Sequence, residues 1–316
     1  MTRIAYFADD AWAVPALDRL CATPGVEVVL VVERSRPSST AIAEAAARHG
    51  LPLVRPDNVN GPEFRADYVG HGIDLAVVHA YDQIFRAPFI DGHPDGMINL
   101  HTALLPRYRG RNPLTWALIA SEPVVGVTAH YIDTGIDTGD ILHQVAVPVG
   151  PDDTFGVVRR RIGPAAASAA AEAVRLLLEG TASDVAIPQG QLGPGFYCSR
   201  RGPGDEYINW HAPADSIHNL VRALAPPGGP GARTTDADGR AWLIQRTEHL
   251  ARTSPHAGCP GRVLAADVAS AVIKTGDTAI RVISAALARN DPSSRGAAPP
   301  WRPALRFVGG LPHNES

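Results

Sequence analysis

The sequence has little lysine, little cysteine and a small net charge, and these shortages argue against particular classes of protein. Lys274 is the single lysine, and 29 Lys+Arg residues against 32 Asp+Glu residues give a formal net charge of −3. Nucleic-acid-binding proteins usually carry a basic surplus, so this balance argues against one. The three cysteines, Cys21, Cys198 and Cys259, show no C-x-x-C spacing, which argues against a disulfide framework or a zinc ribbon.

Long apolar runs are also lacking. No apolar run approaches the roughly 20 residues that a membrane-spanning helix needs, and residues 1–10 show no basic region followed by an apolar stretch. We therefore expect a cytoplasmic protein without a membrane partner. No G-x-G-x-x-G follows the first apolar run, where residues 8–11 read Ala-Asp-Asp-Ala, and this argues against an ordinary dinucleotide-binding domain.

The first half of the 316 residues alternates short β-branched runs with alanine-rich stretches. We expect strands at residues 3–7, 28–32, 51–54, 75–78, 97–100 and 127–131, and helices at 14–20, 39–49 and 155–178. Strand–helix alternation of this kind predicts an α/β fold with a Rossmann-like, doubly wound, mostly parallel sheet. Such sheets place their sites outside the carboxyl ends of the strands.

The composition changes near residue 189. Residues 189–203 are rich in Gly and Pro without periodicity, so we expect a first domain over 1–188, a linker over 189–205 and a second domain over 206–316. One helix at 214–224 and short strands at 241–245, 262–264, 271–274 and 279–283 predict a smaller, barrel-like β domain. Residues 201–316 hold 13 Lys+Arg and 10 Asp+Glu, a surplus of only three.

Asn99 and His101 follow each other with i, i+2 spacing at the end of the fifth expected strand, so both side chains lie on one side of it. An acidic, glycine-punctuated loop, Asp133–Asp140, comes after the next strand. Acyl transfer to an amine passes through an oxyanion, to which an Asn amide and a His can donate. A carboxylate can orient the imidazole and accept the amine proton. These residue types predict a site for acyl transfer.

The stretch INLHTALLPRYRGRNPLTWALIASEPVVGVTAHYIDTGIDTGDIL resembles the signature of folate-dependent formyltransferases, which reads N-x-H, S-L-L-P-x-x-R-G, G-V-T and D-x-G. The resemblance implies that Asn99, His101 and Asp137 are the catalytic residues, and that Asp137 is favoured over Asp133 and Asp140. Ala103 stands where the family has Ser. The family also implies 10-formyltetrahydrofolate as cosubstrate and an OB-like second domain.

FADDAWAVPAL resembles the first strand, loop and helix of this family, and the segment at residues 81–84 resembles the one whose backbone holds the pterin ring. The resemblance implies cofactor contacts at Tyr81, Asp82, Gln83, Ile84, Leu105 and Asp133. We expect no metal, because His79, His93, His130 and His143 fit no ligand spacing. We interpret His130 and His143 as packing or surface residues.

YINWHAPADSIHNLVRAL, together with Ser254–Ala257, resembles sugar-nucleotide formyltransferases of the UDP-4-amino-4-deoxy-L-arabinose type more than methionyl-tRNA formyltransferase. Asn209 stands where the family has Asp. Arg109, Arg111 and Tyr108 are candidate substrate-binding residues, because Arg suits bidentate contacts with phosphate.

We therefore expect an enzyme that formylates the primary amine of a small molecule, such as a nucleotide-linked amino sugar or a specialised metabolite. Methionyl-tRNA and N-hydroxyornithine remain as alternative acceptors. The small basic surplus of residues 201–316 counts against tRNA, since a polyanion is held by basic side chains. An inactive folate-binding sensor is the alternative without catalysis. A homodimer is left open.

Overall fold

The computed structural model describes residues 1–250, 257–288, 301 and 305–308. These residues form two compact units. Unit 1 comprises Met1–Pro113, Val124–Val149 and Val158–Ser199, and unit 2 comprises Leu114–Pro123, Gly150–Val157 and the chain from Arg200 onward. The domain boundaries at 188 and 206 stay predictions. Across the described residues, no helix has both the length and the apolar character needed to cross a membrane.

Unit 1 is built on a seven-stranded sheet with the order β3-β2-β1-β4-β5-β7-β8. The first five strands are parallel, whereas β7 and β8 run antiparallel to their neighbours. The predicted mostly parallel α/β sheet is therefore confirmed. The strands are β1 (Thr2–Ala8), β2 (Val26–Glu33), β3 (Leu53–Val54), β4 (Leu75–His79), β5 (Met97–His101), β7 (Val124–Tyr131) and β8 (Ile141–Pro148).

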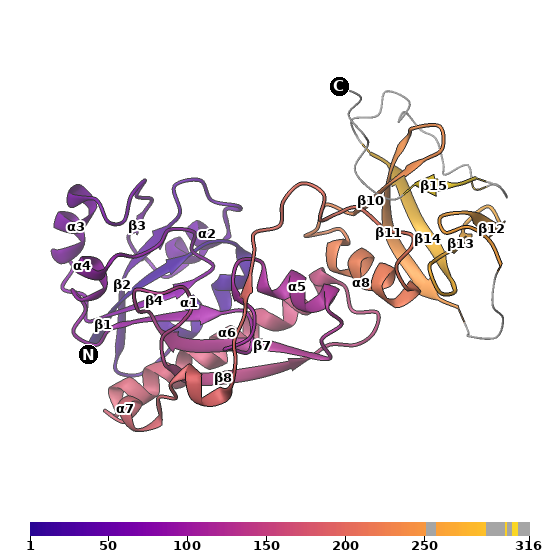
Figure 1. Ribbon diagram of the computed structural model, residues 1–316. Helices are drawn as coiled ribbons and strands as arrows, with labels where there is room; N and C mark the ends of the chain where they lie inside the picture. The colour runs from indigo at the N-terminus through magenta and orange to yellow at the C-terminus, as the bar shows by residue number, and fades with distance from the viewer. Residues whose placement is uncertain (251–256, 289–300, 302–304, 309–316) are drawn as a thin grey trace. The chain divides into compact units, whose positions relative to one another are not determined.

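The apolar runs of β1, β2 and β4 are almost wholly buried, as strands covered on both faces require. Figure 1 shows α3 and α4 near the β3 end of this sheet and α7 near β8. The short helices α3 and α4 have no counterpart among the helices expected from the sequence. The helices are α1 (Val14–Cys21), α2 (Ala41–Arg48), α3 (Pro62–Val69), α4 (Ala87–Ile90), α6 (Phe155–Leu178) and α7 (Ala182–Val185), with 3₁₀ turns η1 (Ala11–Ala13) and η2 (Gln189–Leu192).

The stretch predicted as a linker contains regular structure. Besides η2, it holds β9 (Tyr197–Cys198), which pairs in parallel with β6 (Arg109–Gly110). Up to Ser199 this stretch belongs to unit 1. It therefore lies close to the loop that follows β5, which bears on the site described below.

Unit 2 contains a six-stranded antiparallel sheet with the order β12-β13-β14-β11-β10-β15, which forms a half-barrel. The predicted small β domain with one principal helix is confirmed, and β10 and β15 are additional to the expected strands. Its elements are α5 (Pro113–Ile119), α8 (Ala214–Leu224), β10 (Ala232–Asp236), β11 (Ala241–His249), β12 (Val263–Ala266), β13 (Ala271–Lys274), β14 (Ala279–Leu287) and β15 (Phe307–Val308).

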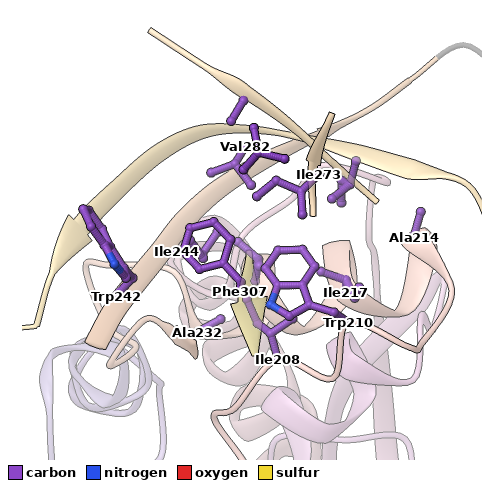
Figure 2. Close-up of a cluster of buried hydrophobic side chains, with 14 of the residues drawn as sticks. Ile208, Trp210, Ala214, Ile217, Ala232, Trp242, Ile244, Ile273, Val282 and Phe307 are labelled. Carbon is purple, nitrogen blue, oxygen red and sulfur yellow. The ribbon is translucent and has the colours of Figure 1, made fainter. Parts of the chain in front are cut away.

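The core of unit 2 is aromatic at its centre. Figure 2 shows side chains from α8 and from the strands gathered around Trp210 and Phe307, whose ring centroids lie 5.8 Å apart. Trp210 and Trp242 are each 1% exposed, and both indole N–H groups have partners. The burial of two such large aromatic side chains, each with its N–H paired, stabilises the fold of unit 2.

Asn209, where the family has Asp, closes the turn around Trp210. Its side-chain oxygen accepts a hydrogen bond from the His211 N–H at 3.0 Å, and its carbonyl accepts one from Ala212 N–H at 3.0 Å. An Asp would supply the same acceptor, so the departure leaves this turn intact. Ser254, Pro255 and His256, which contributed to the resemblance, lie outside the described residues.

Candidate active site

Asn99 and His101 lie on β5, the last parallel strand, and each faces a polar residue of β7. Asn99 is directly opposite His130, and His101 is opposite Thr128. Paired residues of neighbouring strands present their side chains on the same face of the sheet. The antiparallel pairing of β5 with β7 therefore adds a second histidine to the pair expected from the sequence.

Asp137 reaches this face from the loop between β7 and β8. Asp133 braces the loop, because its Oδ1 accepts from Gly135 N at 3.0 Å and from Thr138 Oγ1 at 2.6 Å. Asp137 itself has φ = 53°, a left-handed conformation that non-glycine residues rarely adopt. Such a conformation persists where the surroundings fix it, and it concentrates at functional sites.

The Asp137 carboxylate makes four close approaches. Oδ2 accepts from Gly110 N at 2.8 Å and lies 3.5 Å from Nδ1 of His101. Oδ1 lies 3.2 Å from Nδ2 of Asn99 and 3.6 Å from Nε2 of His130. The structure thus brings together all three residues predicted to be catalytic.

Backbone carbonyls place the histidine protons. His101 Nε2 lies 2.8 Å from the Tyr108 carbonyl oxygen, which can only accept, so Nε2 carries the proton. The other nitrogen, Nδ1, then faces the Asp137 carboxylate. By the same reasoning His130 Nδ1–H donates to the Tyr131 carbonyl at 2.7 Å, which leaves His130 Nε2 as an acceptor 3.2 Å from the Asn99 amide nitrogen.

The environment favours a neutral imidazole beside an ionised carboxylate. Burial lowers the pKa of His101 below its usual 6.5, and this outweighs the opposing effects of the Asp137 charge and the Tyr108 carbonyl. Burial alone would raise the pKa of Asp137. At the low pH where Asp137 titrates, the hydrogen bond and charge of protonated His130, the charge of protonated His101 and the Gly110 N–H outweigh burial and hold that pKa well below its usual range. At neutral pH the ring can accept a proton at Nδ1, and Asp137 would stabilise the resulting imidazolium.

The residues predicted to contact the cofactor lie in three segments of unit 1: the loop at residues 81–84, Leu105, and Asp133, whose contacts are given above. Gln83 ties its loop down by accepting from Val59 N at 2.9 Å and donating to the Pro56 carbonyl at 3.0 Å. Tyr81 packs on Phe7 and burial raises its pKa, whereas Ile84 is 62% exposed. Asp82 lies 3.7 Å from Nε of Arg34. The loop is thus held firmly and presents an apolar side chain outward.

Leu105, also expected near the cofactor, is only 2% exposed. Its N–H donates to Thr128 Oγ1 at 3.1 Å, and its carbonyl accepts from Gln144 Nε2 at 2.8 Å. Thr128 in turn donates to the Ala103 carbonyl at 2.6 Å. The Thr128 hydroxyl therefore fixes the turn in which Ala103 replaces the family's Ser.

The three candidate substrate-binding residues differ in their side-chain contacts and in their exposure. Arg109 donates from Nε and from a terminal nitrogen to Gln189 Oε1, at 3.0 and 2.7 Å. Tyr108 is 8% exposed and packs edge-on against Phe196, with ring centroids 4.6 Å apart. Arg111 is exposed. Of the three, Arg111 is the most exposed and Arg109 is half-buried, and the substrate-binding roles stay predictions.

Three contributors to the site were not expected from the sequence: His130, Gly110 and Gln189. His130, interpreted above as a packing or surface residue, is 1% exposed and contacts Asn99. The i, i+2 spacing of Thr128 and His130 puts both on one face of β7, but it does not show that this face is the one that carries Asn99. Within the described ranges, no group of three His, Cys, Asp or Glu residues is arranged to hold a metal.

Comparison with known proteins gives two family matches. Residues 15–174 match the formyl transferase model, and residues 202–295 match the formyl transferase C-terminal domain model. A methionyl-tRNA formyltransferase of Symbiobacterium thermophilum is 38% identical over 230 residues, which span 73% of this chain and 68% of that protein. One from Aromatoleum aromaticum is 32% identical over 288 residues, 89% of this chain and 88% of that protein.

Solved structures agree on the fold. WlaRD, a sugar 3N-formyl transferase solved with dTDP and 5-N-formyl-THF, covers 90% of this chain and 98% of its own, with a TM-score of 0.68 and 18% identity. A Helicobacter canadensis N-formyltransferase solved with folinic acid and dTDP-3-aminofucose covers 90% of this chain and all of its own, with a TM-score of 0.65 and 16% identity. On both domain matches and on these relatives, the chain belongs to the formyl transferase family and is a formyltransferase.

Proposed function

We propose that this enzyme moves the formyl group of 10-formyltetrahydrofolate to a primary amine, and that its acceptor is the amino group of methionyl-tRNA. The reaction rests on the contact between a neutral His101, an ionised Asp137 and the Asn99 amide. The acceptor rests on the relatives at 38% and 32% identity, both methionyl-tRNA formyltransferases.

The cosubstrate supplies the formyl carbon and leaves as tetrahydrofolate. The residues of the Tyr81–Ile84 loop fit a flat, partly apolar ring, because Gln83 fixes the loop and Ile84 is 62% exposed beside it. Leu105 is only 2% exposed and Asp133 Oδ1 is bonded within its own loop, so their contacts with the cofactor stay predictions. In this assignment Gln83 holds the loop in place and Ile84 offers the apolar contact to the ring.

The amine nitrogen attacks the formyl carbon, and the carbonyl electron pair moves to the oxygen. The proton displaced from the amine passes to Nδ1 of His101, while Asp137, 3.5 Å away, stabilises the imidazolium. When the carbon–nitrogen bond to the folate breaks, the same proton goes to the leaving nitrogen. The products are the N-formyl amine and tetrahydrofolate, and the enzyme returns to its starting protonation.

Asn99 is the donor for the oxyanion in this scheme. Its amide nitrogen lies 3.2 Å from both Asp137 Oδ1 and His130 Nε2, at the long end of hydrogen-bond distances. A developing oxyanion is a stronger acceptor than a neutral imidazole, so it takes the N–H now directed at His130. Donors placed in this way are typically worth about 10²–10³-fold in rate.

A nucleotide-linked amino sugar is the second candidate acceptor, and the sequence alone placed it first. The observation that favours it is charge: residues 201–316 carry a surplus of only three positive charges over 23 charged residues, of which 13 are basic and 10 acidic. A protein that holds tRNA mainly through phosphate contacts usually carries more. We nevertheless rank methionyl-tRNA first, because the sequence identity to methionyl-tRNA formyltransferases is stronger support than the charge balance.

The test is release of tetrahydrofolate from 10-formyltetrahydrofolate with one acceptor at a time: methionyl-tRNA, dTDP- and UDP-linked amino sugars, and N-hydroxyornithine. Release with methionyl-tRNA, weakened by added salt, supports the first proposal. Release with an amino sugar alone supports the second candidate. If no amine supports release although the folate binds, the acceptor lies outside this panel, and if the folate does not bind, the proposed reaction fails.

A further inference from the structure

The segment Gln189–Cys198, here called the strap, runs beside the loop that follows β5. Arg109 N–H donates to the Phe196 carbonyl at 3.0 Å, and Arg111 N–H donates to the Cys198 carbonyl at 3.2 Å. Gly195 lies so close to the Pro106 carbonyl that no Cβ fits there. The strap and the loop are therefore bound together along their length.

That loop provides hydrogen bonds to both reacting side chains. The Tyr108 carbonyl fixes the His101 ring, and Gly110 N–H holds Asp137 Oδ2. Gly110 has φ = +88°, and a Cβ on it would lie 2.7 Å from the Cys198 carbonyl of the strap. Any displacement of the strap would therefore move a group bonded to His101 or to Asp137.

Gln189 is the point at which the strap contacts the Asp137 loop itself. It is 3% exposed, and its Nε2 donates to the Asp137 carbonyl at 2.9 Å and to the Gly139 carbonyl at 2.8 Å. Its Oε1 accepts both contacts from the Arg109 guanidinium. One buried amide thus joins the two segments that position Asp137, and all of its polar atoms are paired.

The backbone is conformationally disfavoured in both segments that Gln189 joins. Asp137 has φ = 53° and Tyr108 has φ = 60°, and both are non-glycine residues in the left-handed region. Neither conformation is expected to last without external contacts that select it. On the Asp137 side Gln189 supplies two of these contacts, through the carbonyls of Asp137 and Gly139, and Gly110 N–H supplies another to the carboxylate.

We propose that Gln189 is a positioning residue for formyl transfer: by joining the Asp137–Gly139 backbone to Arg109, it holds the Asp137 carboxylate at its working distance from His101. The inference rests on the proposed function only in assigning the chemistry to His101 and Asp137. Arg109 then serves the reaction through Gln189, with its guanidinium lying 5.6 Å from the Tyr197 ring centroid.

Two substitutions separate this role from simple stabilisation. Gln189→Glu keeps the size and the acceptor for Arg109, but sets a carboxylate oxygen against the two carbonyls that Nε2 now contacts. Gln189→Leu removes the hydrogen bonds of both Nε2 and Oε1. Gln191→Glu and Gln191→Leu are matched controls, because Gln191 lies two residues away on the same 3₁₀ turn and is exposed.

The readout is the protonation midpoint of His101, followed by NMR with labelled histidine in the full-length protein and assigned with His101→Asn. Asp137 and His130 are the titratable groups that affect His101, and the charge of Asp137 raises its pKa. When the Asp137 loop is released, the midpoint moves to lower pH. We expect this shift in both Gln189 variants, with kcat reduced about tenfold to a hundredfold, and in neither Gln191 variant.

A lower melting temperature with an unchanged His101 midpoint and unchanged kcat, in either folded Gln189 variant, would overturn the proposal. If the Leu variant does not fold, Gln189→Glu still provides the test, because it preserves the Arg109 contact. The titration needs no acceptor. A failure of the proposed function would appear as no formyl transfer by the unaltered enzyme, and would leave the His101 midpoints measurable.

Discussion

Two aspartates, the buried Asp236 of unit 2 and the half-buried Asp137 of unit 1, are held in opposite ways. Asp236 of unit 2 accepts from three neutral N–H groups at 2.9–3.0 Å: the Trp242 indole and the backbone of Asp238 and Arg240. Asp137 of unit 1 has one comparably short contact, to Gly110 N–H, and its remaining neighbours are an amide and two histidines at 3.2–3.6 Å.

The difference separates a structural carboxylate from a reactive one. Short bonds to groups that do not titrate leave Asp236 nothing to exchange, so its contacts serve stability. Asp137 faces histidines at distances that a proton or a substrate atom can close, and its backbone is held in a disfavoured conformation. The long contacts and the disfavoured backbone conformation of Asp137 therefore mark it as a residue held for reaction and not for stability.

Removing the charge of Asp137 tests the reactive side and gives the largest expected effect. Asp137→Asn takes away the group that stabilises the His101 imidazolium, and we expect kcat to fall about 10³-fold. Tetrahydrofolate release at saturating acceptor measures it. Asp140→Asn is the control, because Asp140 is exposed on the same loop and should retain nearly full activity. Equal losses in the two variants would contradict the assignment of Asp137.

The matching change in unit 2 should act on stability. Asp236→Asn places an NH₂ group among three N–H donors, so at least one buried donor loses its acceptor, and we expect a loss of about 3 kcal/mol in the free energy of unfolding. Urea unfolding followed by tryptophan fluorescence measures it, with the exposed Asp238→Asn as control. An unchanged unfolding free energy in Asp236→Asn would contradict the structural role assigned to Asp236.

Two buried histidines extend the contrast. His218 of unit 2 lies 2.9 Å from Thr247 Oγ1 and 3.2 Å from the Pro151 carbonyl, whereas neither ring nitrogen of His79 in unit 1 has a partner. Burial lowers the pKa of His79 to about 4.

Because the unfolded chain binds this proton near pH 6.5, His79 makes stability fall as pH drops from about 6.5 towards 4. At pH 5 the loss is about 2 kcal/mol, and His79→Leu should remove it. Unfolding free energies at pH 7.5 and pH 5 measure the effect, with the partly exposed His71→Leu as control. An unchanged pH dependence in His79→Leu would mean that His79 is not held neutral.

The smallest expected effect concerns a neutral bond. Trp210→Phe removes the indole N–H that donates to Thr234 Oγ1 at 2.9 Å and keeps an aromatic ring in the core. The cost should be about 1 kcal/mol, because a hydrogen bond between neutral groups contributes that much and Thr234 keeps another contact, to the Val308 carbonyl. Trp242→Phe, which strips a donor from a carboxylate, should cost more in the same urea titration. The reverse order would contradict the comparison.

The sequence was informative where burial sets the pattern. The β-branched runs of β1, β2 and β4 predicted buried strands, and the i, i+2 spacing of Asn99 and His101 placed both on one face of β5. The motif also predicted which aspartate of the Asp133–Asp140 loop approaches them.

The sequence was silent where a contact depends on strand direction or on distant backbone. An apolar run has no direction, so the antiparallel pairing that sets His130 opposite Asn99 could not be deduced. Gln189 lies in a Gly- and Pro-rich stretch, and its partners Asp137 and Gly139 are 52 and 50 residues away. Its hydrogen bonds go to main-chain carbonyls, which every residue possesses and no motif records.

The most direct test of the central claim is turnover of 10-formyltetrahydrofolate by His101→Ala beside the unaltered enzyme, with the binding of the folate measured in both. We expect tetrahydrofolate release to be at least about 10²-fold slower at saturating acceptor, with the folate dissociation constant unchanged, because His101 acts on the proton and not on the ring system. Full turnover by His101→Ala would contradict the assignment of the reaction to the Asn99–His101–Asp137 site.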